Sequence, residues 1–577
     1  MDDRTLGVLG GGQLGRMLVE AANNRNISVA ILDKENSPAK QINAHRGVVG
    51  SFADAEAIRK LASECDILTV EIEHVDTQVL EDLEKESLAK GKRLEIHPSW
   101  QAIRTIQDKY LQKLTLEKAN VGLAKSIPID TASEEAMQTA ANILGLPFML
   151  KARKGAYDGR GNYPVRSAED FKPALHALRD QLLYAEQWVD FKKELAVMVV
   201  KTEDEPDPSK WSSSTLSYPT VETVHEDSIC KLVFAPARDL SKGTNSVAQE
   251  VARKAVASFK GKGIYGVEMF LLGDNIILVN EIAPRPHNSG HYTIEACRMS
   301  QYDSHLLAIL ERPIADKGLQ LVKPAIMLNI LGGSDPKSFL ELANAADAIG
   351  AKVHLYGKGD ATKGRKMGHL TVLGDTMEEA EQMIHPLIDI AIDIRAGRPI
   401  RRTNNTSTKA KNKPQPVVGI ITGSISDQPH LEACYKIFDD FGIRYEKGIK
   451  SAHRTPDAMA EYAKTAASRG IKVIIAAAGG AAHLPGMVAA FSKSVVVVGL
   501  PIKPTIGDGM DSLLSMTNMP RGVPVATVGI NNSTNAALTA ARILAADDQG
   551  VREKLEEYAD RAGEESLEND RKLGEDN

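Results

Sequence analysis

Short apolar runs alternate with segments of helical periodicity over the first hundred residues. The runs LGVLG, SVAILD and ILTVEIE have the length of buried strands, and the stretches between them space their apolar residues three or four apart. Strands that alternate with helices predict an α/β unit. We assign this unit to residues 1–105.

The spacing of the apolar runs changes after residue 105. Between residues 106 and 300 the strand-like runs PFMLKAR, ELAVMVV, SICKLVFAPA and IILVNEI lie closer together. This spacing predicts an antiparallel sheet with helices on one face, an α+β arrangement. Residues 301–400 contain AIMLNILGG, AKVHLYGKG and GHLTVLG, which predict a small strand-rich domain that closes the first half.

Residues 401–416, RRTNNTSTKAKNKPQP, separate this first half from a second one. The segment is basic and has almost no apolar side chains, so it cannot bury enough surface to offset its ordering entropy, and we predict a linker. Residues 417–550 then repeat a strand-turn-helix unit that begins with VVGIITGSISD. The repeat predicts a doubly wound parallel sheet whose ligands bind beyond the carboxyl ends of the strands.

Two signals mark helices in this second half. Thr455-Pro456-Asp457 combines a cap residue, a first-turn proline and a first-turn acid, which predicts a helix start after the loop KSAHR. Residues 551–577 form an acidic tail, for which we predict a solvated helix that frays toward its end and carries no chemistry.

Composition narrows the class of protein. The 577 residues carry a net charge of -6 with both signs mixed, which provides no basic field for nucleic acid or for a membrane surface. No apolar run reaches bilayer length and the first residues do not form a signal sequence, so we expect a cytoplasmic enzyme for small molecules. The cysteines are far apart and predict reduced, buried thiols rather than disulfides or a zinc site: Cys65, Cys230, Cys297 and Cys434.

The opening GGGQLGRM suggests a dinucleotide site. Gly10, Gly12 and Gly15 fit the G-x-G-x-x-G pattern, and Asp33 ends the next strand, as in a nicotinamide oxidoreductase. The sequence pattern in the rest of the first half is not typical of a dehydrogenase substrate domain. We therefore expect no NAD or flavin, and we expect these glycines to shape a pocket with Glu71 and Glu73.

A second glycine-rich segment, MLKARKGAYDGRGNYPV, follows a strand. It places Lys151 at the strand end and Gly155, Gly159 and Gly161 in the loop, so that backbone amides and a lysine are available to phosphates. A purely structural glycine hairpin remains the alternative. The segment is not a Walker loop, because the G-x-x-x-x-G-K-[ST] pattern is absent from it.

Acidic residues on apolar strands follow further along the chain. Glu186 and Glu194 flank one loop, and Glu268, Asn280 and Glu281 lie in GVEMFLL and LVNEI. Carboxylates in such surroundings are costly to bury unless they are paired or bind a metal. Oxygen ligands of this kind suit Mg²⁺ that bridges nucleotide phosphates.

These motifs, together with EIEHV, NEIAPRPHNSGHYT and YGKGDATKGRKMGH, resemble the carboxyaminoimidazole ribonucleotide synthases of purine biosynthesis, which are ATP-grasp enzymes. The resemblance spans residue 5 to about residue 400. It implies that ATP phosphorylates bicarbonate and that the amine of 5-aminoimidazole ribonucleotide (AIR) attacks the activated carbon.

The resemblance also implies three sets of site residues. It implies ATP contacts from Lys109, Lys151, Gly155, Gly159, Gly161, Glu186 and Glu194, and Mg²⁺ contacts from Glu268, Asn280 and Glu281. It implies contacts to the ribonucleotide or bicarbonate from Glu73, Tyr157, Asp158, Arg160, Arg285, Lys358, Arg365 and Lys366. The basic run KGRKMGH could instead be a solvated loop, but its place after a strand favours a phosphate site.

In the second half, the loops GSISD, SAHRTP, AGGAAHLPG and GLPIKP fall at predicted strand ends and therefore face one crevice. Ser424, Ser426 and Asp427 at a helix start suit a phosphate and ribose hydroxyls, although capping alone would explain either Ser426 or Asp427. His453, next to Arg454 at a strand end, favours proton transfer. His483 could equally be a hydrogen-bonding group at a helix start.

The strings SAHRTP, AGGAAHLPGM and SLLSMTNMPRGVPVAT resemble the catalytic domain of AIR carboxylases, the carboxyaminoimidazole ribonucleotide mutases, from Pro416 to residue 550. This resemblance implies that His453 is the general acid and base and that no metal is required. It implies substrate contacts from Ser424, Ser426, Asp427, Ser451, Arg454, Gly479, Gly480 and His483. Relatives of this half form octamers, which implies a homo-oligomer of up to eight chains formed through this domain.

The whole chain thus resembles the fused fungal phosphoribosylaminoimidazole carboxylases. The implied reaction is carboxylation of AIR to 4-carboxy-5-aminoimidazole ribonucleotide (CAIR), with N-carboxylation in the first half and transfer to the ring carbon in the second. Two alternatives stay open. One is a carboxylase that uses carbon dioxide directly and has an accessory ATP-grasp half, and the other is an inactive nucleotide sensor that binds partners through its linker and tail.

Overall fold

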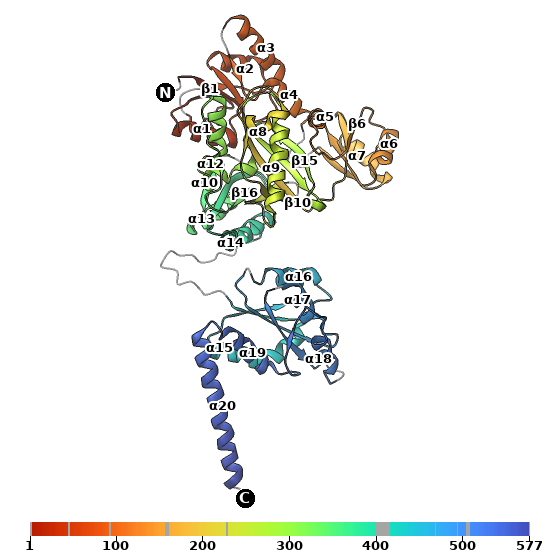
Figure 1. The fold of residues 1–577 in the computed structure, drawn as a ribbon, viewed down its shortest axis with the longest axis vertical. Coiled ribbons are helices and arrows are strands. Elements are labelled where there is room, and N and C mark those ends of the chain that lie inside the picture. The colour runs from red at the N-terminus through yellow and green to blue at the C-terminus, as the bar shows by residue number, and fades with distance from the viewer. Residues whose placement is uncertain are drawn as a thin grey trace. The chain divides into compact units, whose positions relative to one another are not determined.

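The chain divides into two compact units, Met1–Thr403 and Asn404–Asn577 (Figure 1). The computed structural model describes residues 3–43, 47–91, 94–155, 161–226, 229–359, 361–398, 416–467, 469–492, 494–503 and 508–575. Four predicted site residues, Tyr157, Asp158, Gly159 and Arg160, lie outside the described residues, as does nearly all of the predicted linker.

The first domain is the predicted α/β unit, and its sheet is parallel, with strand order β3-β2-β1-β4-β5. Its strands are β1 (Thr5–Leu9), β2 (Ser28–Asp33), β3 (Gly47–Val49), β4 (Ile67–Val70) and β5 (Glu95–Ile96). Its helices are α1 (Gln13–Asn24), α2 (Ala55–Ser63), α3 (Thr77–Ala89) and α4 (Trp100–Gln107). Val8 packs toward α1 while its neighbour Leu9 packs toward α2, so both faces of the sheet are buried.

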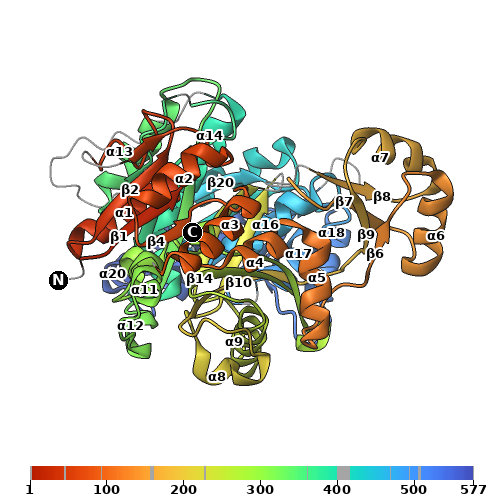
Figure 2. The ribbon, with the colours of Figure 1, turned by 90° about the horizontal axis from the view of Figure 1, so that it is seen from above.

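A separate four-stranded antiparallel sheet follows, with order β6-β9-β7-β8. It contains β6 (Ser126–Ile129), β7 (Phe148–Ala152), β8 (Asn162–Val165) and β9 (Leu183–Gln187), and it is preceded by α5 (Lys109–Lys118). Helices α6 (Glu134–Leu144) and α7 (Phe171–Ala177) pack on it through Met137 and Phe171 and lie on its outer side (Figure 2).

The remaining strands of the first unit form one nine-stranded sheet with order β15-β14-β10-β12-β13-β16-β18-β17, and β11 pairs with β10. The strands are β10 (Lys193–Lys201), β11 (Thr215–Ser217), β12 (Val221–Glu226), β13 (Ile229–Ala235), β14 (Gly263–Leu271), β15 (Ile277–Ala283), β16 (Ala325–Leu331), β17 (Lys352–Leu355) and β18 (Lys366–Leu373). The helices are α8 (Trp211–Ser214), α9 (Lys242–Ala257), α10 (Thr293–Ala296), α11 (Gln301–Ile309), α12 (Asp316–Leu319), α13 (Ser338–Ala348) and α14 (Met377–Ala396).

One expectation about these strands is wrong in detail. PFMLKAR, which is β7, belongs to the small sheet, so residues 106–300 do not share one antiparallel sheet. The strands of the predicted strand-rich segment after residue 320 extend the large sheet, because β16 pairs antiparallel with β13, where Leu328 lies opposite Leu232. This pairing covers an edge of β13 that would otherwise expose unpaired backbone groups.

The second unit is the predicted doubly wound parallel sheet, with order β20-β19-β21-β22-β23. Its strands are β19 (Val418–Thr422), β20 (Tyr445–Ile449), β21 (Val473–Gly479), β22 (Val496–Ile502) and β23 (Ala526–Thr527). Its helices are α15 (Glu432–Phe441), α16 (Pro456–Thr465), α17 (Leu484–Ser492), α18 (Met510–Thr517), α19 (Ser533–Leu544) and α20 (Gln549–Glu575). Ile474 packs toward α16 and α17, and Ile475 packs toward α15 and α19.

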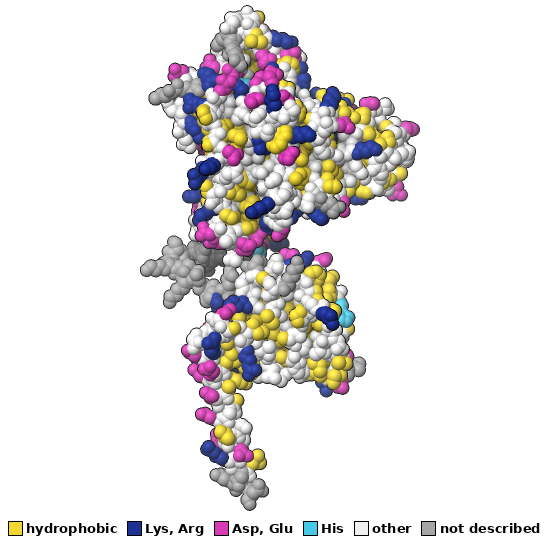
Figure 3. Space-filling view, viewed as in Figure 1, with side chains coloured by type: hydrophobic (Ala, Val, Ile, Leu, Met, Phe, Trp, Pro, Cys, Tyr) yellow, Lys and Arg dark blue, Asp and Glu magenta, His cyan; other side chains and the backbone are white. Residues whose placement is uncertain are grey.

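Local details of this unit differ from the sequence expectations at two places. Helix α16 starts at Pro456 as predicted, but the Thr455 side chain makes no capping hydrogen bond, because its hydroxyl bonds with the Ser451 backbone instead. The predicted tail helix is α20, which continues to Glu575 over the described residues and carries interspersed charges of both signs (Figure 3). None of the described helices is long and apolar enough to cross a membrane.

Two candidate active sites

The opening glycine turn surrounds a buried carboxylate. The amides of Gly12 and Gly15 each donate to Glu71 at 2.6 Å, and the amide of Gly11 donates to Asp33 at 2.6 Å. A Cβ at Gly10, where φ is +100°, or at Gly12 would lie 2.5 Å from the Glu71 side chain. The glycines therefore make room for Glu71, and the amides that a dinucleotide pyrophosphate would require already have acceptors.

Glu186 on β9 lies between two lysines. Its Oε1 is 2.5 Å from the Nζ of Lys151 on β7, and its Oε2 forms an ion pair with Lys113 of α5. The side chains of Glu186 and Lys113 are each only 4% exposed. Burial raises the pKa of Glu186, but the charges of the two lysines outweigh this effect and leave its pKa lowered. Lys151 is thus held at the strand end by a carboxylate that stays charged.

The start of α5 is fixed to the hairpin that carries Lys151. Asp108 caps the helix by accepting from the amides of Tyr110 and Leu111, and it also accepts hydrogen bonds from Nε and Nη2 of Arg153, with Nη2 to Oδ2 at 2.6 Å. The next residue, Lys109, reaches Glu281 at 2.8 Å. The helix start, the β7 hairpin and β15 are therefore tied together by charged hydrogen bonds.

Glu268 and Glu281 face each other across β14 and β15. They occupy opposite positions in the register, and the next pair is Met269 with Val279, so Asn280 is the extra residue of a β-bulge. A bulge turns a side chain from its regular direction, which allows Asn280 and Glu281 to serve the same site although they are consecutive. Burial, followed by the charge of Glu281, raises the pKa of Glu268 to about 7.

Glu194 on β10 has a partner that the sequence analysis missed. The Nδ1 of His225 on β12 is 2.6 Å from Glu194 Oε2, and the charge of Glu268 acts on the same histidine. Burial lowers the pKa of His225, but the hydrogen bond that His225 donates to Glu194 and the charges of the neighbouring carboxylates outweigh it, so its pKa is raised. His225 therefore favours its charged form between two of the predicted ligand carboxylates.

Glu73 and Arg285 form a bidentate pair with distances of 2.5 and 3.2 Å. Burial raises the pKa of Glu73, but the charge and hydrogen bond of Arg285 outweigh it and hold the pKa far below its ordinary range. His287 lies next along this segment, with Nε2 3.5 Å from Glu268, and burial together with Arg285 lowers its pKa to about 3. Glu73, Arg285 and Glu268 therefore belong to one continuous charged region.

The predicted phosphate cations lie on the turn between β17 and β18. Lys358 donates to the backbone oxygen of Lys366 at 2.9 Å and lies over the ring of Tyr356. Arg365 is exposed on the same turn. Because the charge of Lys366 contributes to the lowered pKa of His287, this turn and the Arg285 segment border the same region.

The glycine loop after β7 is described only at its ends. Gly155 and Gly161 have φ angles of +72° and +85°, which favour glycine, and the Gly161 carbonyl accepts from Ala152 at 2.8 Å. These contacts make a hairpin whose tip lies outside the described residues. The role of the loop over ATP phosphates stays a prediction.

The second candidate site lies at the carboxyl ends of the parallel strands of the second unit. After β19, Ser424 and Asp427 form a reciprocal capping box, and the Ser426 hydroxyl donates to Ser424 at 3.0 Å. After β20, Arg454 donates to the Gly423 carbonyl at 2.8 Å, and its own amide donates to the buried Ser451 hydroxyl at 3.2 Å. Arg454 thus joins the first two loops of the crevice.

His453 and His483 meet at this crevice. The Nε2 of His453 is 2.8 Å from the Nδ1 of His483, and the rings are perpendicular. Both side chains are exposed, so solvent and small molecules reach them. Because a neutral imidazole has one donor and one acceptor nitrogen, the contact fixes complementary tautomers in the pair.

The third loop of the crevice is built on glycine. Gly479 ends β21, and Gly480, with φ of +65°, donates its amide to Ser512 of α18 at 2.8 Å. A Cβ at Gly479 would lie 3.2 Å from the Ile502 carbonyl, so the loop passes close to the end of β22. Sequence analysis missed Ser512, whose hydroxyl also donates to Ile502 and thereby anchors this loop.

Comparisons with known proteins agree with this division. Family profiles match residues 3–107 (ribonucleotide synthetase preATP-grasp domain), 114–302 (ATP-grasp domain), 325–383 (phosphoribosylaminoimidazole carboxylase C-terminal domain) and 417–565 (AIR carboxylase). The phosphoribosylaminoimidazole carboxylase of Saccharomyces cerevisiae is 48% identical over 99% of this chain and 98% of its own length.

Relatives of the first half alone are also found. The N5-carboxyaminoimidazole ribonucleotide synthase of Staphylococcus epidermidis is 34% identical over 66% of this chain and 94% of its own. A crystal structure of N5-carboxyaminoimidazole synthase from Aspergillus clavatus in complex with ADP and AIR is 54% identical. It covers 68% of this chain and 99% of its own, with a TM-score of 0.63.

Proposed function

The chain belongs to the phosphoribosylaminoimidazole carboxylase family, and on this basis we propose that it converts AIR to CAIR in two steps at two separate sites. The first unit uses ATP and bicarbonate to carboxylate the exocyclic nitrogen of AIR. The second unit moves the carboxylate from that nitrogen to the ring carbon. The relatives named for the synthase alone support the assignment of the first step to the first unit.

In the first step a bicarbonate oxygen attacks the terminal phosphorus of ATP, ADP leaves, and the AIR amine attacks the carbon of the resulting carboxyphosphate with loss of phosphate. Phosphoryl transfer needs placed positive charge and exclusion of water more than a covalent nucleophile. Lys109 and Lys151 supply such charge, and their carboxylate partners hold them in place before ATP binds.

The site fits Mg²⁺ because it brings two carboxylates together, of which Glu281 is bonded to Lys109 whereas Glu268 keeps a raised pKa. Glu268 and Glu281 lie directly opposite each other, and the raised pKa of Glu268 reflects burial and the charge of Glu281. We propose that Glu268, Asn280 and Glu281 would hold the ion, which would supply positive charge to neutralise the transferred group.

The other side of the first site suits the ribonucleotide and bicarbonate. Arg285, held by Glu73, faces this region, and the turn with Lys358, Arg365 and Lys366 supplies cations for the phosphate of AIR. Tyr157, Asp158 and Arg160 complete the proposed set, although they lie outside the described residues.

In the second step His453 is the proposed general acid and base. It protonates the exocyclic nitrogen as the carboxylate leaves as carbon dioxide, and it removes the proton from the ring carbon after carbon dioxide adds there. His483, at 2.8 Å, holds His453 in one tautomer and lines the ring with Gly479 and Gly480. Ser424, Ser426, Asp427, Ser451 and Arg454 bind the ribonucleotide phosphate and ribose.

The observation that carries the proposal is the Glu268 and Glu281 pair with Lys109 and Lys151 around it, in a chain whose other unit carries the histidine pair. The test is ADP release by the purified chain. We expect release to require both AIR and bicarbonate. ADP release that ignores AIR, or CAIR formation from carbon dioxide at full rate without ATP, would contradict the first step.

We also propose an oligomeric state and a cellular location for the protein. We propose a homo-oligomer of up to eight chains formed through the second unit, where Ile425, Met510 and Leu514 are large apolar side chains that are 70%, 47% and 48% exposed. We also propose a cytoplasmic location, since all four cysteines are buried and unpaired. Light scattering of the purified chain and cell fractionation test these two points.

We propose that each segment of the chain has its own role in these two steps. Residues 1–105 and 301–400 shape the ribonucleotide side of the first site, residues 106–300 bind ATP, and residues 417–550 perform the second step. Residues 401–416 connect the halves, and residues 551–577 carry no catalytic group.

A further inference from the structure

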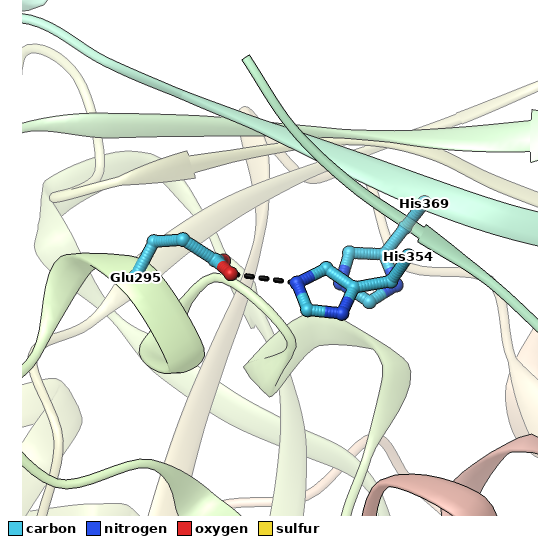
Figure 4. Close-up of side chains that lie close together, drawn as sticks. All are labelled: Glu295, His354 and His369. Carbon is cyan, nitrogen blue, oxygen red and sulfur yellow. Dashed lines mark hydrogen bonds and ion pairs between the residues drawn. The ribbon is translucent and has the colours of Figure 1, made fainter. Parts of the chain in front are cut away.

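A partly buried cluster of side chains lies beside the first site and has no role in the mechanism above. Glu295 of α10, His354 of β17 and His369 of β18 lie together (Figure 4). Nε2 of His354 is 2.6 Å from Oε1 of Glu295. The rings of His354 and His369, which are opposite each other in the register of β17 and β18, stack with 4.6 Å between centroids and 11° between planes.

The stack continues to His291. Its ring centroid is 4.6 Å from that of His369, and its Nδ1 accepts from Gln301 at 3.3 Å and contacts the Tyr302 hydroxyl at 3.1 Å. Burial lowers the pKa of both His291 and His369 well below the ordinary range, so both rings are neutral. His354 is thus the ring of the stack with a carboxylate partner.

The cluster joins the two segments that are proposed to hold the ribonucleotide. Strands β17 and β18 carry the turn with Lys358 and Lys366, whereas Glu295 belongs to the segment that begins with Arg285. On its other side the turn is held by the hydrogen bond from Gln41 Nε2 to the Gly357 carbonyl at 2.9 Å and by backbone hydrogen bonds of Gly364 and Arg365 with Gly332. The hydrogen bond between His354 and Glu295 is a side-chain link between the strands that carry the turn and the Arg285 segment.

A link of this type is not needed for stability alone. A largely buried polar pair gains little over well-packed apolar residues of similar volume, whereas its directional hydrogen bond specifies one arrangement of the elements that it joins. We propose that Glu295 and His354 are positioning residues that set the turn bearing Lys358 and Lys366 at the distance from Arg285 that the ribonucleotide requires. This inference rests on the proposed function of the first unit.

A metal ion is the competing interpretation of the same side chains. Two imidazoles and a carboxylate are ligands that Zn²⁺ accepts, and Nε2 of His369 and Oε2 of Glu295 have no hydrogen-bond partner among the described residues. However, Nε2 of His354 is already bonded to Glu295, and the lone pair of an imidazole nitrogen lies in the plane of its ring. A single ion about 2 Å from each nitrogen cannot lie in both planes of a parallel stack.

The test compares three variants with the unchanged chain in the ADP-release assay. His354→Leu removes the bond to Glu295, and we expect the KM for AIR to rise about tenfold while the KM for ATP and kcat stay within about twofold. His354→Gln keeps a donor near the Nε2 position and should recover most of the AIR affinity. The matched control is His385→Leu, an exposed histidine of α14, which should change neither KM.

The double variant Glu295→Leu/His354→Leu separates positioning from stability. We expect it to recover the melting temperature that His354→Leu loses, because an apolar pair replaces the hydrogen-bonded pair, but to keep the raised KM for AIR. Recovery of the KM, an equal rise in the KM for ATP, or no change in His354→Leu would overturn the proposal. One zinc per purified chain, lost in His354→Leu, would overturn it in favour of a metal site.

These outcomes are distinct from failure of the proposed function. If the unchanged chain showed no AIR-stimulated ADP release, the function would be refuted before any variant was made. A variant result that contradicts positioning leaves that release intact and refutes only the role of the pair.

Discussion

The two candidate sites differ most in how they treat charge. In the first unit, Glu186 is enclosed by Lys151 and Lys113, and Glu73 is held by Arg285 in a buried bidentate pair. In the second unit, His453 and His483 are exposed, and the neighbouring groups are mainly hydroxyls and backbone amides. The first site therefore contains closely spaced and largely buried charged side chains, whereas the second site contains an exposed pair of histidines.

The difference follows from the chemistry proposed for each site. Transfer of a phosphoryl group spreads negative charge over several oxygens, so preplaced cations in a low-dielectric site lower the barrier strongly. Movement of a carboxylate between two atoms of one substrate needs a proton donor and acceptor, and a histidine near neutral pH meets that need. The comparison predicts that each site can be disabled without the other.

The largest expected effect is that of His453→Asn. Removal of the proposed proton carrier should slow CAIR formation by about 10³-fold, because general acid and base catalysis contributes on that scale. AIR-stimulated ADP release should stay within about twofold of the unchanged chain, since that step occurs in the other unit. Glu461→Gln on the exposed face of α16 is the control, and loss of both activities in His453→Asn would erase the distinction between the sites.

Next in size is Lys151→Met. This change leaves Glu186 with Lys113 as its ion-pair partner and removes a cation from the phosphate region, so kcat/KM for ATP should fall about 10²-fold. Conversion of the added N-carboxylated intermediate to CAIR should continue at its normal rate. Lys172→Met, an exposed lysine of α7, is the matched control. A slowed second step would show that the sites are not independent.

A smaller effect is the pH dependence of activation by Mg²⁺. The pKa of Glu268 is raised to about 7, so below pH 7 a proton competes with the ion, and above pH 7 the carboxylate is free to bind it. The free Mg²⁺ concentration for half-maximal ADP release should be about tenfold higher at pH 6 than at pH 8. EDTA should not change the rate of the second step at any pH in this range. A Mg²⁺ requirement that is the same at pH 6 and pH 8 would contradict the assignment of Glu268.

The smallest effect is expected for Ser424→Ala. Loss of the capping box should lower the stability of the second unit by about 1 kcal/mol, measured by calorimetry, and weaken ribonucleotide binding there. The transition of the first unit should not move. Ser426→Ala is the milder control, because Ser426 donates to Ser424 without closing the box. A shift in the first unit's transition would mean that the units do not unfold separately.

The sequence was sufficient for features that depend on local patterns. Alternation of apolar runs and helices predicted the α/β character of the first domain and the parallel sheet of the second unit, whose strands bury neighbouring residues such as Ile474 and Ile475 on opposite faces. Lys113 could also have been predicted as a site residue, because it follows Lys109 by one helical turn and therefore shares its face of α5.

Contacts that depend on the pairing of strands distant in the sequence could not be predicted from the sequence. His225 lies in a stretch without a motif, and only the pairing of β10 with β12 brings it to Glu194. The same holds for Glu295 and His354, which come together because β17 joins the large sheet next to β18. The glycine pattern at Gly10 was informative about backbone shape and uninformative about the ligand, because the amides bind Glu71 and Asp33.

The central claim is that one chain carries out two different carboxylations at two sites, and the fate of labelled bicarbonate tests it most directly. The unchanged chain and His453→Asn would each be given AIR, ATP, Mg²⁺ and ¹³C-bicarbonate, and the products examined by ¹³C NMR. The account predicts a ring carboxylate from the unchanged chain, and only the nitrogen carbamate, formed together with ADP, from His453→Asn. A ring carboxylate from His453→Asn, or no carbamate from either protein, would contradict it.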